Sequence, residues 1–536
     1  MPNHCIPYQD TGYFSNLILD YLAQDKRVDF LYQRFPNIEN FGLQIQEKTT
    51  NYQHSNRRIL VDCINRQYRD LQLSELTKQH IKNLEKHNTF TITTGHQLNL
   101  FTGPLYFLYK IISTINLCKE LKQKYPENNF VPLYWMATED HDLEEINFFN
   151  FKDKKVVWDR NSGGAVGELS TEGLEKVYET FSKELGTSPN AEKLKALFKE
   201  AYLHHKNLAD ATRYLANELF GEYGLVILDA NVKDLKQLFA PYLHEELFQK
   251  NSSKIIEKTN EDINSIPGKN YKLQVNPREI NLFYLEDDSR ERIIEKDDVF
   301  YINTSGKQFS KHEMETEVNN HPLRFSPNVM LRPLYQEVIL PNLCYIGGGG
   351  ELAYWLQLKD YFKTQNVSFP ILLLRNSALL VSSKTMEKIS KLEVSMEDLF
   401  LQPHALKTKV TKQISAIKID FSQQRAHLKE QFKELYKLAE QTDKSFKGAV
   451  AAQEKKQLNG LDNLEKRLLK AQKRKLADHL ERVAVLQDEL FPNGSLQERT
   501  TNFSEFYLEY GESLLKLLFE KLIPLQAEFS CLELRG

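Results

Sequence analysis

Short apolar runs, bounded by turn-forming residues, punctuate the first three quarters of the chain. Four of these runs are rich in β-branched or aromatic residues and predict buried β-strands over residues 89–93, 130–137, 224–228 and 371–374. Between the first two, residues 105–121 show the periodicity of an amphipathic helix. A strand, a helix and a second strand form a βαβ unit, which predicts a parallel sheet.

Residues 407–490 show a different pattern, with no proline and with apolar residues repeated every seven positions. The repeats are Phe421, Leu428 and Leu435; Phe432, Ala439 and Phe446; and Leu469, Leu476, Val483 and Leu490. A polar stretch, residues 441–448, separates two such helices. We therefore expect an antiparallel hairpin with arms of about 40 residues, or roughly 60 Å. The turn-forming residues 491–494 (FPNG) predict its end.

Together these patterns predict an α/β fold with a parallel-sheet core, two insertions between its strands and a long antiparallel α-helical coiled-coil domain. The expected boundaries place the core in residues 1–151, 204–238 and 326–381, the insertions in residues 152–203 and 239–325, the coiled-coil hairpin in residues 382–491, and a segment returning to the core in residues 492–536. Because one hairpin leaves apolar groups uncovered, we expect it to form a homodimer.

The charge balance narrows the range of partners. The 536 residues include 70 Lys and Arg against 73 Asp and Glu, a net charge of −3, which argues against a nucleic-acid or membrane partner. No signal-peptide pattern begins the chain and no run approaches the ~18 apolar residues of a membrane span, so we expect a cytoplasmic location. Five scattered cysteines without a CxxC pair predict neither disulfides nor a zinc site.

Polar residues follow the predicted strands, at the edge where α/β sheets bind ligands. Thr94-Gly95-His96-Gln97 forms a small-residue turn before a helix, which would bring backbone N–H groups and an imidazole close to a phosphate. A turn whose histidine only caps the helix is the alternative. The motif GxxxxGK[ST] is absent, so no P-loop nucleotide site is expected.

A second cluster follows the next strand, where residues 138–142 (TEDHD) include Glu139, Asp140 and His141. Burial of so many ionisable groups requires a substrate ammonium, a metal or basic partners. A solvated loop is the alternative. Because no HExxH or His-x-His spacing occurs, no metal ligands are expected.

Four consecutive glycines, residues 347–350, precede Glu351 and an amphipathic helix. N–H groups at a helix start suit an anion, and Glu351 could receive an amine; a flexible turn is the alternative. Arg332 and Gln336 lie in the preceding segment. Arg375 follows the last strand, where a guanidinium could bind phosphate or carboxylate or form a structural ion pair.

Five segments that carry these residues stand in a characteristic order. They are TTGHQLNLFTGPLYFLYK, VPLYWMATEDHDLEEIN, SPNVMLRPLYQEVILPN, YIGGGGELAYW and FPILLLRNSALL. In this order the chain resembles the BshC family of bacillithiol biosynthesis over essentially its whole length. The resemblance implies a Rossmann-like core with two connecting-peptide insertions and a coiled coil that mediates a homodimer. It also implies a ligase that adds L-cysteine to glucosaminyl-malate, through an amide bond to the glucosamine amine, in the last step of bacillithiol biosynthesis.

The candidate catalytic residues are His96, Asp140 and Glu351. The candidates for binding substrate or nucleotide are Thr94, Gly95, Gln97, Asn99, Glu139, His141, Arg332, Gln336, Gly348, Gly349, Gly350, Tyr354, Trp355, Arg375 and Asn376. His96 and the glycine amides are expected to stabilise phosphate or oxyanion charge. Asp140 or Glu351 is expected to hold the cysteine ammonium or to act as base. Arg332 and Arg375 are candidates for malate carboxylates or nucleotide phosphates.

Because a carboxylate is a poor electrophile, we expect activation by ATP, as an acyl-adenylate or acyl-phosphate, with Mg²⁺ as a candidate cofactor. The core is similar in layout to class I aminoacyl-tRNA synthetases, but only residues 95–97 (GHQ) stand where their HxGH signature would be. Residues 383–385 (SKT) resemble their KMSKS loop only weakly. Gly349 stands where we expect proline in the BshC family. The alternatives are a nucleotidyl- or aminoacyl-transferase acting on another acceptor, and a nucleotide-binding coiled-coil scaffold.

Overall fold

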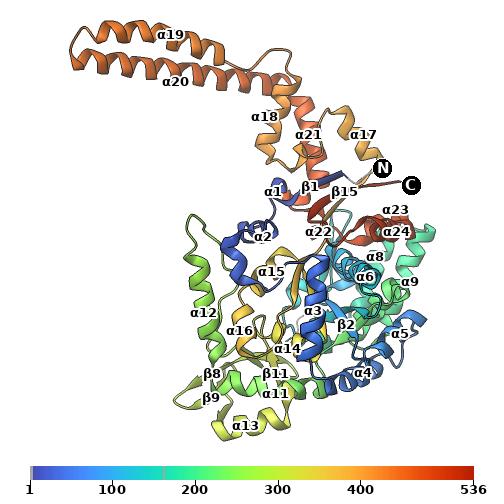
Figure 1. Ribbon diagram of the computed structural model, residues 1–536. Helices are drawn as coiled ribbons and strands as arrows, with labels where there is room; N and C mark the ends of the chain where they lie inside the picture. The colour runs from blue at the N-terminus through green and yellow to red at the C-terminus, as the bar shows by residue number, and fades with distance from the viewer. Residues whose placement is uncertain (1–3, 161–162, 536) are drawn as a thin grey trace. The chain divides into compact units, whose positions relative to one another are not determined.

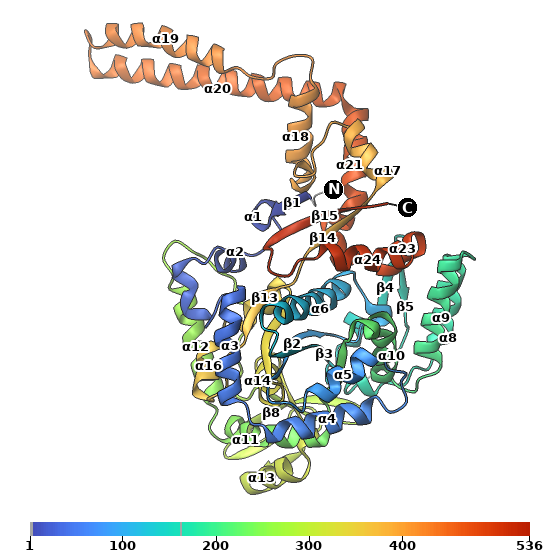
Figure 2. The same ribbon diagram turned by 45° about the vertical axis from the view of Figure 1, so that its right-hand side comes forward.

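A sheet of five parallel strands organises the larger of two units in this computed structural model, which describes residues 4–160 and 163–535 (Figures 1 and 2). In spatial order its strands are β13 (Ile371–Leu374), β12 (Asn342–Gly347), β2 (Thr89–His96), β3 (Asn129–Met136) and β6 (Val226–Asp229). The four strands expected from the apolar runs are all present. The pattern missed β12, because its few apolar residues lie between a proline-asparagine pair and the glycine run.

The strand register brings the carboxyl ends of the sheet to one edge. His96 pairs with Met136, which in turn pairs with Asp229, and Gly347 pairs with Leu374. The residues that follow these strands therefore meet at the same edge, as parallel topology requires.

Helix α6 (Tyr106–Lys124) connects β2 to β3 and contacts both strands (Figure 2). It is buried around most of its circumference, because α3 (Ile38–Asn51) also packs against it. A core cluster of α3, α6 and sheet side chains includes Phe41, Phe90, Leu117 and Ile346. Each such side chain contributes roughly 1.5–3 kcal/mol on burial, so this interior holds the sheet edge in place.

Two long connections interrupt the sheet. Between β3 and β6 stand the hairpin β4 (Phe148–Phe151) and β5 (Lys154–Val157), and the helices α8 (Leu174–Leu185), α9 (Pro189–Leu203) and α10 (Leu208–Phe220). Between β6 and α14 (Arg332–Ile339) stand α11 (Lys233–Phe248), α12 (Asn251–Asn264), α13 (Lys311–Asn320) and a second, antiparallel sheet.

The second sheet has the strand order β10-β9-β8-β7-β11. These strands are β7 (Leu282–Glu286), β8 (Ser289–Lys296), β9 (Val299–Ile302), β10 (Gln308–Ser310) and β11 (Phe325–Pro327). Two short β runs are expected in this connection from the sequence, at residues 281–285 and 299–302, and they correspond to β7 and β9.

Residues near the two ends of the chain pair with each other. Strand β15 (Glu528–Leu534) runs antiparallel to β1 (His4–Pro7) and also neighbours β14 (Ala378–Ser382). Before β15 come the short helices α22 (Gln497–Thr500), α23 (Phe503–Tyr510) and α24 (Glu512–Lys521). Residues 495–535 belong to the same unit as the parallel sheet, so they can supply side chains to it.

The second unit, residues 10–12 and 381–494, is helical. An antiparallel hairpin of α19 (Ser422–Ala439) and α20 (Lys444–Lys475) confirms the predicted coiled coil. Its turn lies within the polar stretch, and the Tyr436 hydroxyl donates across the pair to Glu454 at 2.8 Å. In the same unit, α17 (Ser383–Lys391) begins at the SKT residues, where Thr385 N–H is capped by Ser382.

The arms of the hairpin are shorter than the heptads predict. The first arm contains 18 residues and the second 32, because the chain breaks after α18 (Pro403–Ile414) and again before α21 (Ala477–Leu490). The buried seam comprises Phe432, Ala439 and Val450. Leu435 and Phe446, which also fit a seven-residue repeat, are 40% and 47% exposed. Neither break contains proline or glycine, so no residue pattern marks them in advance.

Candidate functional site

A cavity of about 1010 Å³ opens at the carboxyl edge of the parallel sheet. Segments that follow β2, β3, β12 and β13 line it, together with residues 274–278, 283 and 290 of the second connection. Among the candidates chosen from the sequence, those that line it are Gly95, His96, Gln97, Glu139, Asp140, Arg332, Gly348, Gly349, Gly350, Glu351, Tyr354 and Arg375. Most of the candidates thus converge on one space.

Six other candidates lie outside the cavity wall. Thr94 is buried and donates its hydroxyl to the Ile346 carbonyl at 2.7 Å, and Asn376 is held by Ser113 and Ile523. The remaining four are Asn99, His141, Gln336 and Trp355. Of these, Gln336 accepts from Arg332 and Trp355 stacks on Tyr345, so both support lining residues from behind.

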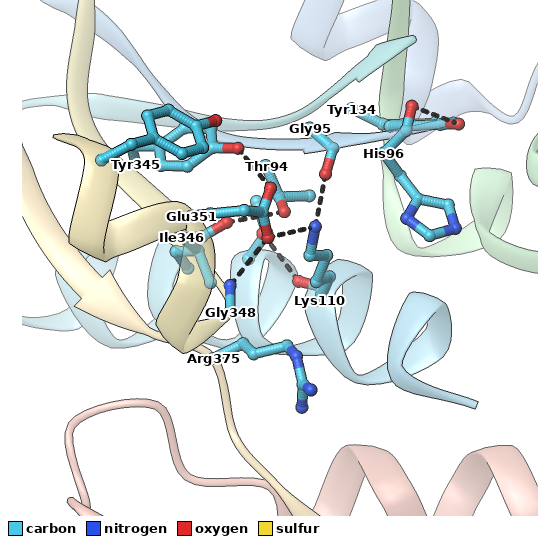
Figure 3. A network of polar contacts seen from close by, with 12 residues as sticks. Thr94, Gly95, His96, Lys110, Tyr134, Tyr345, Ile346, Gly348, Glu351 and Arg375 are labelled. Carbon is cyan, nitrogen blue, oxygen red and sulfur yellow. Dashed lines mark hydrogen bonds and ion pairs between the residues drawn. The ribbon is translucent and has the colours of Figure 1, made fainter. Parts of the chain in front are cut away.

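Glu351 is held by a network of polar contacts (Figure 3). Its Oε2 lies 2.6 Å from Lys110 Nζ and accepts the Gly348 N–H at 2.8 Å, and its Oε1 accepts the Tyr345 hydroxyl at 2.8 Å. Burial alone would raise the pKa of Glu351, but Lys110 and these hydrogen bonds outweigh it and hold the pKa below its ordinary value. Such a carboxylate is a weak base, so the geometry favours a positioning role over the expected catalytic one.

Lys110 is the residue of this network that the sequence analysis missed. It is buried near the N-terminal end of α6 and also donates to the Gly95 carbonyl oxygen at 2.7 Å. Burial lowers its pKa, while Glu351 counteracts this effect. A lone lysine inside an otherwise apolar helical stretch, residues 105–112, is the signal that could have found it. Lys110 thereby ties the end of β2 to the start of the glycine-rich helix α15 (Gly349–Trp355).

The glycine run is more ordered than a flexible turn. Gly348 is the N-cap of α15, and its N–H is already occupied by Glu351 rather than free for an anion. A Cβ at Gly349 would be 3.6 Å from Ile18, and one at Gly350 would be 3.8 Å from Gln274, which are ordinary contacts. Gly349 and Gly350 therefore keep side chains out of the cavity that they line, and neither has the positive φ that would require glycine.

His96 ends β2 and is buried between Tyr106 and Phe107, whose ring centroids lie 5.3 and 5.0 Å from its own. Burial and the nearby Lys110 lower its pKa to about 3, so the imidazole is neutral at pH 7. Its Nε2 is buried without a hydrogen-bond partner in the described structure. His96 is therefore a neutral group with one ring nitrogen left for a ligand, not a cation that attracts phosphate by charge.

A constrained loop supports His96 from behind. Phe101, Thr102 and Gly103 all have positive φ angles, of 47°, 69° and 64°, and the Thr102 backbone hydrogen-bonds to His96. The Asn502 side-chain amide donates to the carbonyl oxygens of Phe101 and Gly103, at 2.8 and 2.6 Å. Phe101 and Thr102, which are not glycines, store strain in this conformation, and tertiary contacts must offset it.

Arg375 follows β13 and is buried in a structural ion pair. Its Nη2 donates to Glu498 Oε1 at 2.7 Å, and the two side chains are 4% and 1% exposed. Glu498 also accepts the Ala378 N–H at 3.1 Å. The remaining Arg375 Nε is buried without a partner in the described structure, and a Cβ at Gly348 would lie 3.8 Å from it. Structural contacts therefore occupy most of the N–H donors of this guanidinium, and one N–H faces the glycine run.

Arg332, at the start of α14, is surrounded by aromatic rings. Its guanidinium lies 5.5–5.9 Å from the ring centroids of Trp135, Tyr345 and Trp355. It donates to Gln336 Oε1 at 3.1 Å and to the Tyr354 hydroxyl at 3.2 Å, which are both neutral acceptors. Among the residues that the structure describes, no carboxylate contacts it, so its charge is available to an anionic ligand.

The acidic cluster after β3 is partly neutralised. Glu139 lies 2.6 Å from Lys236, whose side chain is fully buried. Asp140 accepts from Gln97 Nε2 at 2.9 Å and from the His141 N–H at 2.8 Å. Burial would raise the pKa of Asp140, but the His141 side chain, these hydrogen bonds and Arg290 bring it down to about 2, so Asp140 is an anion at pH 7.

The cavity as a whole carries an excess of positive charge. Its lining contains six cationic side chains (Lys110, Arg278, Arg290, Arg332, Arg375 and Arg499) and three acidic ones (Glu139, Asp140 and Glu351). Such a lining attracts anions and keeps a place for one cationic group beside Asp140. Within residues 4–160 and 163–535, no group of three or more His, Cys, Asp or Glu side chains could hold a metal ion.

The sequence matches family models along almost its whole length. Residues 1–376 match the N-terminal Rossmann-like domain of bacillithiol biosynthesis BshC, and residues 378–534 match its C-terminal coiled-coil domain. The chain belongs to the BshC family. The parallel-sheet core and the helical hairpin described above are the two domains of that family. In the described part of the chain, no helix is both long and apolar enough to cross a bilayer.

Curated BshC relatives agree with this assignment. Proteins from Christiangramia forsetii and Flavobacterium johnsoniae are each 59% identical to this chain, and in both comparisons the match covers 99% of each sequence. Both are provisionally named cysteine ligase BshC. A crystal structure provisionally described as an arginyl-tRNA synthetase, from Campylobacter jejuni, matches at 11% identity with a TM-score of 0.23, over 84% of this chain and 98% of the other. That likeness is too weak to inform the function.

Proposed function

We propose that this BshC-family protein is an ATP-dependent ligase that joins the carboxylate of L-cysteine to the amine of glucosaminyl-malate, in the last step of bacillithiol biosynthesis. The observation that carries this proposal is the cation-rich cavity of about 1010 Å³ at the carboxyl edge of the sheet. A cavity of this size stands at the upper end of the range for small-molecule sites, roughly 300–1,000 Å³, and suits more than one substrate. The names of the curated BshC relatives support the cysteine-ligase part.

The chain's own groups fit anionic substrates. Arg332 has no contacting carboxylate, and His96 Nε2 and Arg375 Nε are buried donors or acceptors without partners in the described structure. Of these three groups, the two arginines would hold a nucleotide's phosphates. ATP, when bound, supplies the leaving group that turns the cysteine carboxylate into an electrophile; Mg²⁺ would come with its phosphates, since the described side chains form no metal site.

Asp140 would hold the cysteine ammonium, because it is ionised and lies beside Gln97 in the cavity lining. The sugar amine must lose a proton as the amide forms, and neutral His96 has a free ring nitrogen that can accept it. An anion bound nearby would stabilise the imidazolium and raise the pKa of His96 from its low value in the free protein. Lys110 and Glu351 would fix the spacing between the His96 turn and the glycine run.

The direct test is product formation. The purified protein is incubated with ATP, Mg²⁺, L-cysteine and glucosaminyl-malate, and the products are identified by mass spectrometry, with each component omitted in turn. We expect a cysteinyl amide of glucosaminyl-malate only in the complete mixture. Product without ATP, or a cysteine adduct on another acceptor in preference to glucosaminyl-malate, would contradict the proposal.

A further inference from the structure

Two guanidinium groups share one aromatic ring on the wall contributed by the second connection. Arg290 Cζ lies 4.0 Å from the ring centroid of Phe283, and Arg278 Cζ lies 5.5 Å from it. Phe283 belongs to β7, Arg290 to β8, and Arg278 to the irregular segment before β7. All three residues line the cavity. Stacking on a ring orients a guanidinium without using its N–H donors.

The contacts of Arg290 orient it but include no ion pair. It donates to Ser326 Oγ at 3.1 Å and to the Pro327 carbonyl at 3.2 Å, and its Nη1 lies 3.2 Å from His141 Nδ1. None of these three partners is a carboxylate. Burial lowers the pKa of Arg290, while Glu139 and Asp140 counteract this effect from farther away. An anionic ligand would stabilise a positive charge that has no ion pair in such a partly desolvated site.

The two nearby acidic residues do not form an ion pair with Arg290. Glu139 is bound to Lys236 at 2.6 Å, and Asp140 accepts from Gln97 and from the His141 N–H. Arg278 is exposed at this wall. Partial desolvation of its guanidinium and the like charge of Arg292 lower its pKa. The described structure thus presents two guanidinium groups beside one ring, with no carboxylate in contact with either.

We propose that Arg278 and Arg290 bind the two carboxylates of the acceptor substrate, so that this wall recognises the dicarboxylate end of glucosaminyl-malate. The inference rests on the proposed function and specifies which substrate occupies which wall. Two guanidinium forks suit two planar carboxylates, each of which can accept a bidentate pair. The other cations, Arg332 and Arg375, lie at the sheet edge beside His96 and the glycine run and would serve the phosphates.

Steady-state kinetics of Arg278→Ala, Arg290→Ala and the double variant test this assignment. We expect KM for glucosaminyl-malate to rise roughly 10- to 100-fold, as loss of a charged hydrogen bond predicts, with KM for ATP and cysteine little changed. Methyl glucosaminide, an acceptor that lacks carboxylates, should be used equally well by all variants and the wild type. Lys296→Ala, which removes a charge from the same strand β8 outside the cavity lining, is the matched control.

A binding measurement separates this inference from the proposed function. Saturation-transfer NMR with L-malate alone should show binding to the wild type and to Lys296→Ala, and loss of binding in the double alanine variant. If the wild type makes no amide but binds L-malate in this way, the proposed function fails and the dicarboxylate site stands. Melting curves of all variants identify any misfolding. The Arg278→Lys/Arg290→Lys variant, which keeps the charge, is a second control for the alanine changes.

Three results from the variants would overturn the inference: undiminished malate binding in the double variant, an unchanged KM for the acceptor, or a rise confined to the KM for ATP. The last result would assign the pair to phosphate binding. Absence of malate binding in the wild type would also overturn it.

Discussion

Lys110 Nζ lies 2.6 Å from Glu351 Oε2, so a lysine near the start of α6 pairs with a carboxylate in the first turn of α15. The same lysine donates to the Gly95 carbonyl, and the same carboxylate accepts the Gly348 N–H. The pair therefore joins the two turns that follow the neighbouring strands β2 and β12 in the cavity lining. Its role is to hold these turns at a fixed separation.

Because the two residues act through each other, Lys110→Met and Glu351→Gln should show non-additive effects. Each single change should lower kcat by roughly 10- to 100-fold, and the double variant should be no worse than the poorer single variant. Turnover of the four proteins under saturating substrates measures this coupling. Losses that multiply in the double variant would show that the two residues act independently.

The low pKa of His96 predicts an acid-sensitive contribution to stability. The folded-state pKa of about 3 lies below the ordinary value of 6.5, so the unfolded chain binds more protons between these pH values. Stability should therefore fall as the pH drops below 6.5, by up to about 2 kcal/mol at pH 5. Urea unfolding at pH 7 and pH 5 should show a smaller loss for His96→Gln than for the wild type. An equal loss in both proteins would contradict the neutral, buried imidazole.

Removal of Glu498 should be costly because it leaves a buried charge. Glu498→Ala leaves Arg375 buried without its carboxylate partner. Breaking a buried pair in this way costs about 3–5 kcal/mol of folding free energy. The control is Glu512→Ala, which removes an exposed pair with Lys193 at 2.6 Å and should cost at most about 1 kcal/mol. Thermal unfolding of the two variants compares them. Similar melting temperatures would mean that the Arg375 pair is not the structural anchor described here.

Gly103 is required by both its conformation and its surroundings. Its φ angle is +64°, and a Cβ there would lie 2.6 Å from the Asn99 Cβ. Gly103→Ala should destabilise the protein by more than about 1 kcal/mol and lower turnover, because the loop supports His96. Gly460→Ala, inside α20 where an added Cβ would meet no atom within 4 Å, should instead stabilise by roughly 0.5–1 kcal/mol. Equal effects at the two sites would contradict the strained-loop account.

The helical hairpin should mediate a homodimer through its exposed apolar residues. Leu435, Leu438, Phe446 and Leu464 are 40–56% exposed, although the seam of the hairpin is already filled by Phe432, Ala439 and Val450. Leu438→Glu/Leu464→Glu should convert a dimer into a folded monomer, as measured by sedimentation. A wild-type chain that sediments as a monomer would contradict this prediction.

The sequence located the parts of the site that follow from local rules. His96, Asp140 and Arg375 follow recognisable strands, and parallel topology places the ends of such strands together. It could not locate partners that are distant in the chain, such as Glu498, which lies 123 residues from Arg375. Nor could it place Arg278 and Arg290, because they come from an irregular segment and a polar strand with no pattern that marks a cavity.

Activation of the cysteine carboxylate by ATP is the central step of the proposed reaction, and an isotope measurement tests this step directly. L-Cysteine carrying ¹⁸O in both carboxylate oxygens is incubated with the protein, ATP, Mg²⁺ and glucosaminyl-malate, and the products are analysed by mass spectrometry. One ¹⁸O should remain in the amide, and the other should appear in AMP or in phosphate. Amide formation with the second ¹⁸O released to water, or no amide at all, would contradict the account.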